Sequence, residues 1–421
     1  MPTKKSPVKA TSKELKKPAV TLSEPKKRFT GRFLVCLDPE AKTPEVMRQA
    51  KTKGLQLTTL QDLAAGNTDA MLITALGQAD GIIFDRLKVA VINETGADRL
   101  KQLQHVKGSH FLSSEPERYL RAFQATSKGR GGKGISFRDT ATATWGIHAM
   151  NAAKSPFTGK GIKMAILDTG FDFTHPDFAG RTIHRKSFVG TRQAKDKEGH
   201  GTHCAGIAGG GRKGQAGVQY GVAPGTRLYI GKILDDGGEG SDGLALAGIE
   251  WALEKGCQVI SMSFGAPVET GSHSVVFEQV ARIAMEHKCL LVAATGNESD
   301  REEGLIAPVN HPANCPSVIA VGALNASLKI AEFSCAGTDA TSGQVDIAAP
   351  GDNILSTWPG GKYRRESGTS MAAPFVAGAA ALLWEQYPDS SAEGIWLKLI
   401  QQARRSTLPA SDIGAGLVYA Q

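Results

Sequence analysis

The sequence predicts an α/β protein, with a parallel sheet covered by helices on both faces and a small α+β domain in front of it. From about residue 141 onward, short apolar segments bounded by glycines alternate with Ala-rich helical segments. This alternation is typical of a parallel sheet that is buried on both faces. Before residue 124, extended and helical segments follow the order β-α-β-β-α-β. This order predicts a separate small domain.

The large domain is expected to contain five parallel strands and four helices. In sheets of this kind, catalytic and binding side chains gather at the carboxyl ends of the strands. The expected strands are 163–167, 227–234, 258–263, 289–294 and 318–321, and the expected helices are 200–208, 242–255, 274–288 and 369–387.

The small domain is expected at residues 31–123, followed by a Gly- and Lys-rich linker at 124–140 and the large domain at 141–421. Its middle, at residues 60–85, shows no clear pattern and is expected to be irregular. The expected strands are 32–37, 55–59, 87–93 and 109–123, and the expected helices are 43–53 and 97–104.

The net charge of +8 comes almost entirely from a basic tail at residues 1–30. This tail is rich in Pro, Ser and Thr, which predicts disorder. Because the folded part is nearly neutral, no specific nucleic-acid partner is expected, although attachment of the tail to nucleic acid or an anionic membrane stays open. No apolar run reaches the length of about 20 residues that a transmembrane helix needs. No secretory signal is visible, which favours a cytoplasmic location and leaves non-classical export open.

The six cysteines show no zinc or redox spacing. They are expected to be buried free thiols, and disulfides stay open if the protein is exported. The six are Cys36, Cys204, Cys257, Cys289, Cys315 and Cys335.

Two candidate catalytic residues lie at an expected strand end and helix start. Asp168 ends the strand 163–167 ahead of Gly170, although an Asp at this place can also simply cap a turn. His200 opens a helix between two glycines, where a neutral imidazole can accept a proton from a hydroxyl and later return it. His203 leaves a metal site as an alternative, but the third ligand and helical Glu of zinc motifs are missing.

Ser370 and Asn297 complete a possible catalytic set. Ser370 lies in the first turn of a helix, where serine is commonly an N-cap. Its backbone N–H would lack a partner within the helix and could donate to an oxyanion. Asn297 follows the strand 289–294, either in a left-handed turn or as a second oxyanion donor. A serine nucleophile needs a base, an orienting acid and such donors, and the four residues supply one candidate for each role.

The segments around these four residues resemble the subtilases, the subtilisin-like serine proteases. The resembling motifs are AILDTG with Asp168, GHGTHCAG with His200, AATGN with Asn297 and SGTSMAAP with Ser370, with GVAPG at 221–225 between them. The resemblance implies a subtilisin-like fold and a serine endopeptidase that acts on proteins or peptides and needs no cofactor for its chemistry. Cys204 and STWPGG at 356–361 resemble the proteinase K branch of the family.

The resemblance also implies how substrates bind. A substrate would lie as an added strand between two backbone segments. An apolar primary pocket would favour a large apolar residue before the cleaved bond, and Glu239 and Glu298 could add tolerance for basic residues. The two segments are expected at Gly238, Glu239 and Gly240 and at Ser263, Phe264 and Gly265, and the pocket at Ala293, Ala294, Gly296 and Glu298.

Structural calcium is a further implication of the resemblance. The Asn- and Asp-rich calcium loop of many subtilases corresponds to residues 209–221, which contain no carboxylate. A second site, resembling one of proteinase K, would use the carbonyls of Pro316 and Val318 and the carboxylate of Asp346. Calcium prefers such oxygen ligands. The alternative is an Asp that binds nearby backbone.

The small domain resembles the ferredoxin-like propeptide of subtilases, which assists folding and then inhibits the enzyme. Its last strand, residues 114–123, resembles the propeptide tail that fills the cleft as a product. The resemblance implies a precursor that cuts itself after Phe123 and keeps its own propeptide as an intramolecular inhibitor.

Overall fold

The computed structural model describes residues 28–65, 79–123, 125, 136–190, 193–211, 217–268, 272–338 and 343–420. Nearly all of the expected tail, and the linker apart from residue 125 and residues 136–140, lie outside the described residues. Among the helices of the described part, none is long and apolar enough to cross a lipid bilayer.

The large domain is built on the predicted parallel sheet, which has seven strands in the order β14-β13-β12-β10-β6-β8-β7. The apolar strands are buried along their length because helices cover both faces of the sheet. The strands are β6 (Lys163–Asp168), β7 (His184–Ser187), β8 (Arg227–Lys232), β10 (Val259–Met262), β12 (Leu290–Ala294), β13 (Ile319–Leu324) and β14 (Ile347–Pro350).

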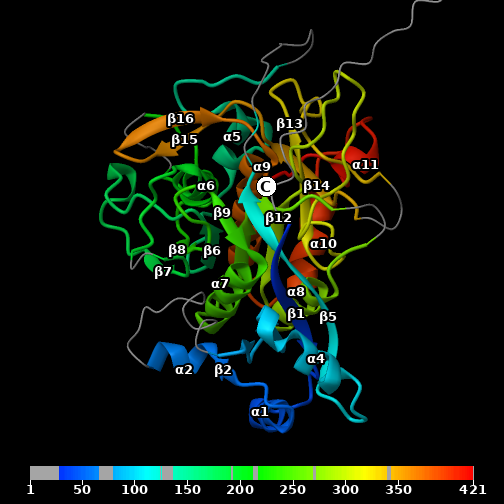
Figure 1. Cartoon of the computed structure of the whole chain (residues 1–421). Helices are drawn as coiled ribbons and strands as arrows, with labels where there is room; N and C mark the ends of the chain where they lie inside the picture. Colours follow the sequence, from blue (N-terminus) through cyan, green and yellow to red (C-terminus); the bar gives the residue numbers. More distant parts are fainter. Residues whose placement is uncertain are drawn as a thin grey trace, which may run out of the picture.

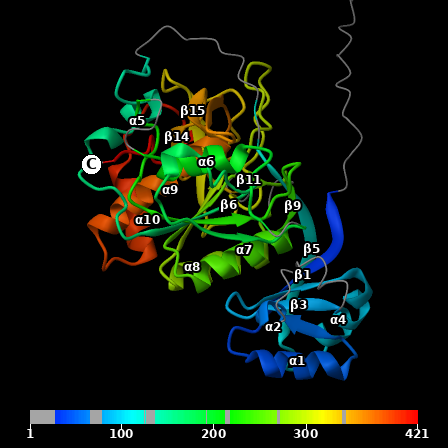
Figure 2. The ribbon, with the colours of Figure 1, turned by 90° about the vertical axis from the view of Figure 1, so that its left-hand side faces the viewer.

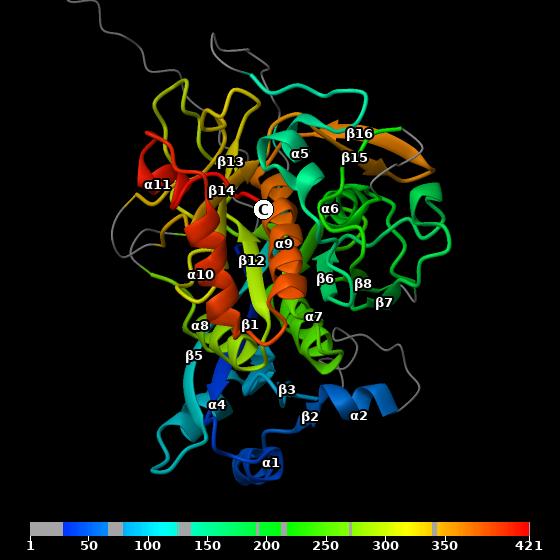
Figure 3. The ribbon, with the colours of Figure 1, turned by 180° about the vertical axis from the view of Figure 1, so that it is seen from behind.

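Figure 2 shows the sheet between two helical layers. One layer lies beside the small domain and contains α7 (Asp242–Glu254) and α8 (Val275–Glu286). The other layer contains α6 (His200–Gly209), α9 (Thr369–Gln386) and α10 (Ala392–Gln402), and the last two run side by side in the rear view of Figure 3. Smaller elements are α5 (Trp145–Ala149), α11 (Ala410–Ile413), β9 (Glu239–Ser241), β11 (Phe264–Gly265) and the hairpin of β15 (Ile354–Trp358) and β16 (Lys362–Glu366).

The small domain contains a five-stranded sheet in the order β5-β1-β4-β3-β2. The expectation of an irregular stretch at residues 60–85 is wrong in part, because a helix and a strand form there. The strands are β1 (Phe29–Leu37), β2 (Leu57–Thr59), β3 (Gly81–Phe84), β4 (Val89–Ile92) and β5 (Phe111–Ala122), and the helices are α1 (Thr43–Thr52), α2 (Leu60–Ala65) and α4 (Ala97–Gln104).

The sheet of the small domain is covered by two different partners. One face packs against its own helices α1 and α4, in a cluster that includes Val46, Leu100 and Phe111. The other face packs against α7 and α8 of the large domain, so Leu34 and Phe84 belong to the same apolar cluster as residues of those helices. Figure 1 shows the small domain below α7 and α8, with β5 running up into the large domain.

Candidate active site

Asp168 and His200 meet where strand β6 ends and helix α6 begins. The His200 Nδ1 atom lies 2.8 Å from Asp168 Oδ1 and 3.0 Å from Oδ2, and both side chains are buried. Burial by itself would lower the pKa of the imidazole, but the nearby carboxylate outweighs it and raises the pKa of His200 well above its ordinary value. The carboxylate orients the ring through Nδ1, and Nε2 has no hydrogen-bond partner in the described part of the chain.

Glycines on both sides of His200 let α6 start close to its neighbours. Gly199 has a φ of 115°, and a methyl group there would overlap the ring of Trp358. A methyl group on Gly201 would overlap the backbone oxygen of Gly170, just after Asp168. Larger residues at these positions would push the imidazole away from its carboxylate.

Ser370 lies in the first turn of α9, as predicted, and is fully buried. Its hydroxyl donates to the carbonyl of Ser263 at 2.9 Å, and no hydrogen bond to His200 is found. The two residues nevertheless lie on adjoining segments, because Cys204 Sγ is 3.5 Å from the Ser370 carbonyl oxygen and 3.8 Å from His200 Nδ1. The hydroxyl must leave Ser263 before it can donate to Nε2. Catalytic hydrogen bonds often form only when a substrate is productively bound.

Asn297 is held by Thr369, a residue that the sequence analysis does not single out. The backbone N–H and the hydroxyl of Thr369 both donate to Asn297 Oδ1, each at 2.9 Å. The Nδ2 atom of Asn297 makes no bond to Thr369. It is buried without an acceptor among the described residues. The sequence signal for Thr369 is its place directly before Ser370 in the GTS motif.

The carbonyl oxygen of Phe123 lies near both candidate oxyanion donors, although Asn297 Nδ2 makes no hydrogen bond to it. A methyl group placed on Gly368 would lie 2.9 Å from Asn297 Nδ2, 3.1 Å from the Phe123 oxygen and 3.6 Å from the Ser370 nitrogen. These three atoms therefore surround one small space. The last residue before the expected cleavage point therefore has its carbonyl oxygen close to the two candidate oxyanion donors.

Strand β5 of the small domain lies between the two segments expected to form the substrate cleft. On one side Leu120 pairs with Gly240 and Arg121 with Glu239, and the N–H of Ala122 donates to the Gly238 carbonyl at 3.0 Å. On the other side Ala122 pairs with Phe264 and Arg121 with Gly265, both antiparallel. The N–H of Phe123 reaches the Ser263 carbonyl at 3.4 Å, and Ala125 pairs with Ser367 beyond it.

The residues expected to form the primary pocket differ in where they face. Ala294 belongs to the same buried cluster as Phe123, whereas Ala293 packs into the cluster on the opposite face of the sheet. Gly265 lies under the Phe123 ring, since a methyl group on Gly265 would be 2.5 Å from it. Glu298 is engaged by the protein, because its Oε2 accepts from the Asn297 N–H and the Asn310 amide at 2.8 Å and 2.6 Å.

The alternative of a metal site at His200 and His203 is not favoured by the geometry. His203 Nε2 lies 3.0 Å from the Ile354 carbonyl and 3.1 Å from that of Arg364, so it binds backbone. Burial lowers the pKa of His203 to about 3 and keeps it neutral. Among the described residues, the cluster of three His, Cys, Asp or Glu side chains that could hold an ion joins Asp168, His200 and Cys204. All six cysteines are buried and free, as expected.

The expected calcium ligand Asp346 precedes β14, beside β13. Its Oδ2 accepts the backbone N–H of Ala320 at 2.8 Å, which places it close to the segment that contains Pro316 and Val318. Burial raises the pKa of Asp346 to about 7. The charged form of this carboxylate is therefore unfavourable in the folded protein. A cation bound beside it would stabilise the charged form, so the group fits a calcium site.

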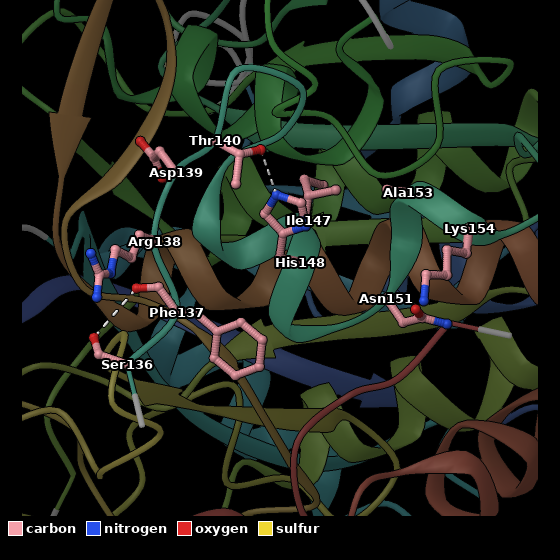
Figure 4. A pocket seen from close by; sticks show the side chains of 10 residues that line it. All are labelled: Ser136, Phe137, Arg138, Asp139, Thr140, Ile147, His148, Asn151, Ala153 and Lys154. Carbon is pink, nitrogen blue, oxygen red and sulfur yellow. Dashed lines mark hydrogen bonds between the residues drawn. The ribbon is translucent and has the colours of Figure 1, made fainter. Parts of the chain in front are cut away.

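A separate pocket of about 440 Å³ lies near the start of the large domain (Figure 4). Within it, the Thr140 hydroxyl lies 2.8 Å from His148 Nε2. Its lining contains none of the predicted site residues, so it does not belong to the candidate active site. It is lined by Ser136, Phe137, Arg138, Asp139, Thr140, Ile147, His148, Asn151, Ala153 and Lys154.

The fold and the site together define the class of protein, and comparison with known families agrees. The model of the subtilase family matches residues 159–416, which is more than half of the chain. The chain therefore belongs to the subtilase family, and it is a serine-type endopeptidase.

The most similar curated proteins include several subtilisins. The chain is 36% identical to subtilisin E of Bacillus subtilis strain 168 over 333 residues, which cover 77% of this chain and 83% of that protein. It is 42% identical to the subtilisin of Bacillus pumilus over 234 residues, with coverage of 55% and 80%. It is 37% identical to the major intracellular serine protease of Bacillus subtilis strain 168 over 274 residues, with coverage of 62% and 82%. The match with subtilisin E is longer than residues 159–416, so the similarity extends beyond them.

Proposed function

We propose that this subtilase is made as a self-inhibited precursor, cuts its own chain after Phe123, and then cleaves proteins after large apolar residues. In this proposal Ser370 is the nucleophile, His200 the base and Asp168 its orienting acid. Asn297 and the Ser370 N–H bind the oxyanion. The observation that carries the proposal is the position of the Phe123 carbonyl beside these two donors.

The chemistry follows from the atoms around Phe123. The Ser370 oxygen attacks the Phe123 carbonyl carbon while His200 Nε2 takes the hydroxyl proton. Negative charge then develops on the Phe123 oxygen, where Asn297 Nδ2 and the Ser370 N–H can stabilise it. When the intermediate collapses, the C–N bond to residue 124 breaks and His200 returns the proton to the leaving amine. Water then hydrolyses the Phe123 ester by the same route in reverse.

The preference for a large apolar residue rests on the surroundings of the Phe123 side chain. Phe123 is only 5% exposed and shares a buried cluster with Ala294. Burying an aromatic side chain of this size stabilises a bound substrate by roughly 1.5–3 kcal/mol relative to leaving it in water. Because Glu298 already binds Asn297 and Asn310, its tolerance for a basic residue at this position would require those bonds to open.

Self-inhibition follows from the way β5 occupies the cleft. Its backbone pairs on both sides with the large domain, in the manner of an added substrate strand. The small domain also donates the N–H groups of Arg86 and Leu87 to Glu250 on α7, each at 3.2 Å. A segment bound at so many points leaves the cleft slowly after it has been cut. We therefore assign residues 31–123 as propeptide and residues 141–421 as catalytic domain.

The proposal is tested by expressing the full chain beside Ser370→Ala. The unchanged protein should separate into two fragments, the larger beginning at residue 124, and should react with a fluorophosphonate. Ser370→Ala should stay intact and unlabelled, with activity lower by about four to six orders of magnitude, as for triad members of subtilisin. Ser406→Ala, which changes an exposed serine, is the matched control and should behave like the unchanged protein. A larger fragment beginning elsewhere, at Gly129 for example, would refute cleavage after Phe123.

We further propose that calcium binds Asp346 together with the carbonyls of Pro316 and Val318. The support is the donor chemistry and the raised pKa of Asp346, since a partly buried carboxylate gains from a nearby cation. The role of such an ion would be to tie β13 to β14, away from the reacting atoms. No cofactor is required for the chemistry proposed above.

A further inference from the structure

We propose that this enzyme selects substrates with a basic residue at the third and at the sixth position before the cleaved bond, through Glu239 and Asp242. The inference rests on the proposed function, because the positions are counted back from Phe123. Arg121 is then the third residue and Arg118 the sixth. Both arginines belong to β5, and both carboxylates belong to the large domain.

The third position faces Glu239. Arg121 pairs directly with Glu239 in the antiparallel ladder between β5 and β9, and Arg121 Nε lies 3.4 Å from Glu239 Oε1. The ladder holds any bound strand in this register, so the third side chain of every substrate would lie beside Glu239. Both side chains are nearly half exposed, at 45% and 47%. An ion pair of such exposure changes binding by a factor of about two to five.

The sixth position faces Asp242, the first residue of α7. Asp242 is fully buried, and its Oδ2 accepts the backbone N–H of Arg118 at 2.9 Å. The Arg118 guanidinium lies 3.6 Å from the same oxygen, and Oδ1 lies 2.9 Å from His311 Nε2. A buried carboxylate is screened less by salt than an exposed one, so the charge at the sixth position should matter more than the charge at the third.

The two carboxylates remain in the large domain after the small domain has left. Glu115 of the small domain also lies 3.6 Å from the Arg118 guanidinium, but a short substrate would bring no such neighbour. A substrate arginine at the sixth position would therefore find Asp242 as its anionic partner. A neutral residue at the sixth position would leave the Asp242 carboxylate without a cation from the substrate. This is unfavourable, because the carboxylate loses contact with water when the substrate binds.

Cleavage of short peptides by the enzyme matured from the full chain tests the inference. The reference peptide is an N-acetylated copy of residues 118–125, so that the sixth position keeps its neutral backbone N–H, and two others replace by Gln the residue that corresponds to Arg121 or to Arg118. Relative to the reference, kcat/KM should fall about three-fold for the first replacement and about ten-fold for the second. The three-fold effect should shrink in 0.5 M NaCl, because the pair at the third position is exposed to solvent.

Enzyme variants assign each effect to its carboxylate. Glu239→Gln should abolish the discrimination at the third position and retain that at the sixth, and Asp242→Asn should do the reverse. Glu254→Gln, which removes an exposed charge at the far end of α7, should preserve both ratios. If Asp242→Asn does not fold, Glu239→Gln still tests the inference for the third position. The peptide series then tests the inference for the sixth position.

Two failures can be told apart. If all peptides are cut equally, or if Glu239→Gln keeps the discrimination at the third position, the inference is overturned while the proposed function stands. If no peptide is cut after Phe, the proposed function fails and the inference falls with it.

Discussion

At the residue scale, the amide of Asn297 can serve an oxyanion only while its orientation is fixed. Thr369 supplies that orientation through two hydrogen bonds to Oδ1, one from its backbone and one from its hydroxyl. The same hydroxyl accepts the N–H of Gly296 at 3.1 Å. Loss of the hydroxyl would leave one bond to the amide and let Nδ2 turn away from the position of the oxyanion.

Asn297→Ala should therefore lower kcat by about 10²–10³-fold with little change in KM, because the lost donor acts mainly in the transition state. Thr369→Val should lower kcat by about ten-fold, because the amide stays present but is less well oriented. Steady-state kinetics on a peptide with Phe before the cleaved bond measures both. Thr369→Ser keeps the hydroxyl and should restore most of the activity, and equal losses in Thr369→Ser and Thr369→Val would contradict an orienting role.

The sequence predicts which residues meet at the site, but not every bond between them. Asp168 and His200 can be predicted from the sequence, because Asp168 ends an apolar strand and His200 starts a helix flanked by glycines. The hydrogen bond from Ser370 to Ser263 cannot be predicted from the sequence, because it depends on how α9 packs beside β10 and β11. The contact of Cys204 with Ser370 cannot be predicted either, because it also depends on packing.

At the element scale, Asp346 connects two neighbouring strands at the edge of the large sheet. Its carboxylate accepts an N–H of β13 just before β14 begins. Because burial raises its pKa in the folded protein to about 7, the folded state binds more protons than the unfolded state between about pH 4 and pH 7. The contribution of this group to the free energy of unfolding therefore decreases as the pH rises through this interval.

Asp346→Asn should remove this dependence. The variant should be more stable than the unchanged protein at pH 8, by roughly 4 kcal/mol, and nearly equal to it at pH 4. Both proteins carry Ser370→Ala, so that self-cleavage does not interfere, and their urea unfolding is followed at both pH values. Calcium should raise the stability at pH 8 only where Asp346 is present. An equal effect of calcium on both proteins would rule out the proposed ion site.

Short elements are the ones that the sequence predicts poorly. Strand β3 has four residues and lies in a stretch where apolar residues recur with no clear period. Strand β7 has the sequence HRKS, which contains no apolar run. Both form because a neighbouring strand offers hydrogen bonds, which is a tertiary effect. The longer elements β6, α7 and α9 are predicted within one or two residues, because their patterns persist over a full strand or helix.

At the scale of the whole molecule, the small domain shares its core with the large one. Strands β3 and β4 read GIIF and VAVI and are buried on both faces, which is unusual for a small, mostly antiparallel sheet that covers only one face with its own helices. The unbroken apolar runs are the sequence signal for a second covering layer. The identity of that layer could not be predicted, because α7 and α8 follow more than a hundred residues later.

A fragment of residues 28–123 should therefore fail to form a stable sheet when made alone. Separation would expose the face that contains Leu34 and Phe84, which are fully buried in the whole chain, while the cluster around Phe111 would stay covered. A domain of this size that loses half of its core has too little apolar burial to offset the entropy of folding. The fragment should bind a hydrophobic dye and melt without a cooperative transition in circular dichroism. Full-length Ser370→Ala should bind little dye and melt cooperatively, and similar behaviour of the isolated fragment would show that the small domain folds without the large one.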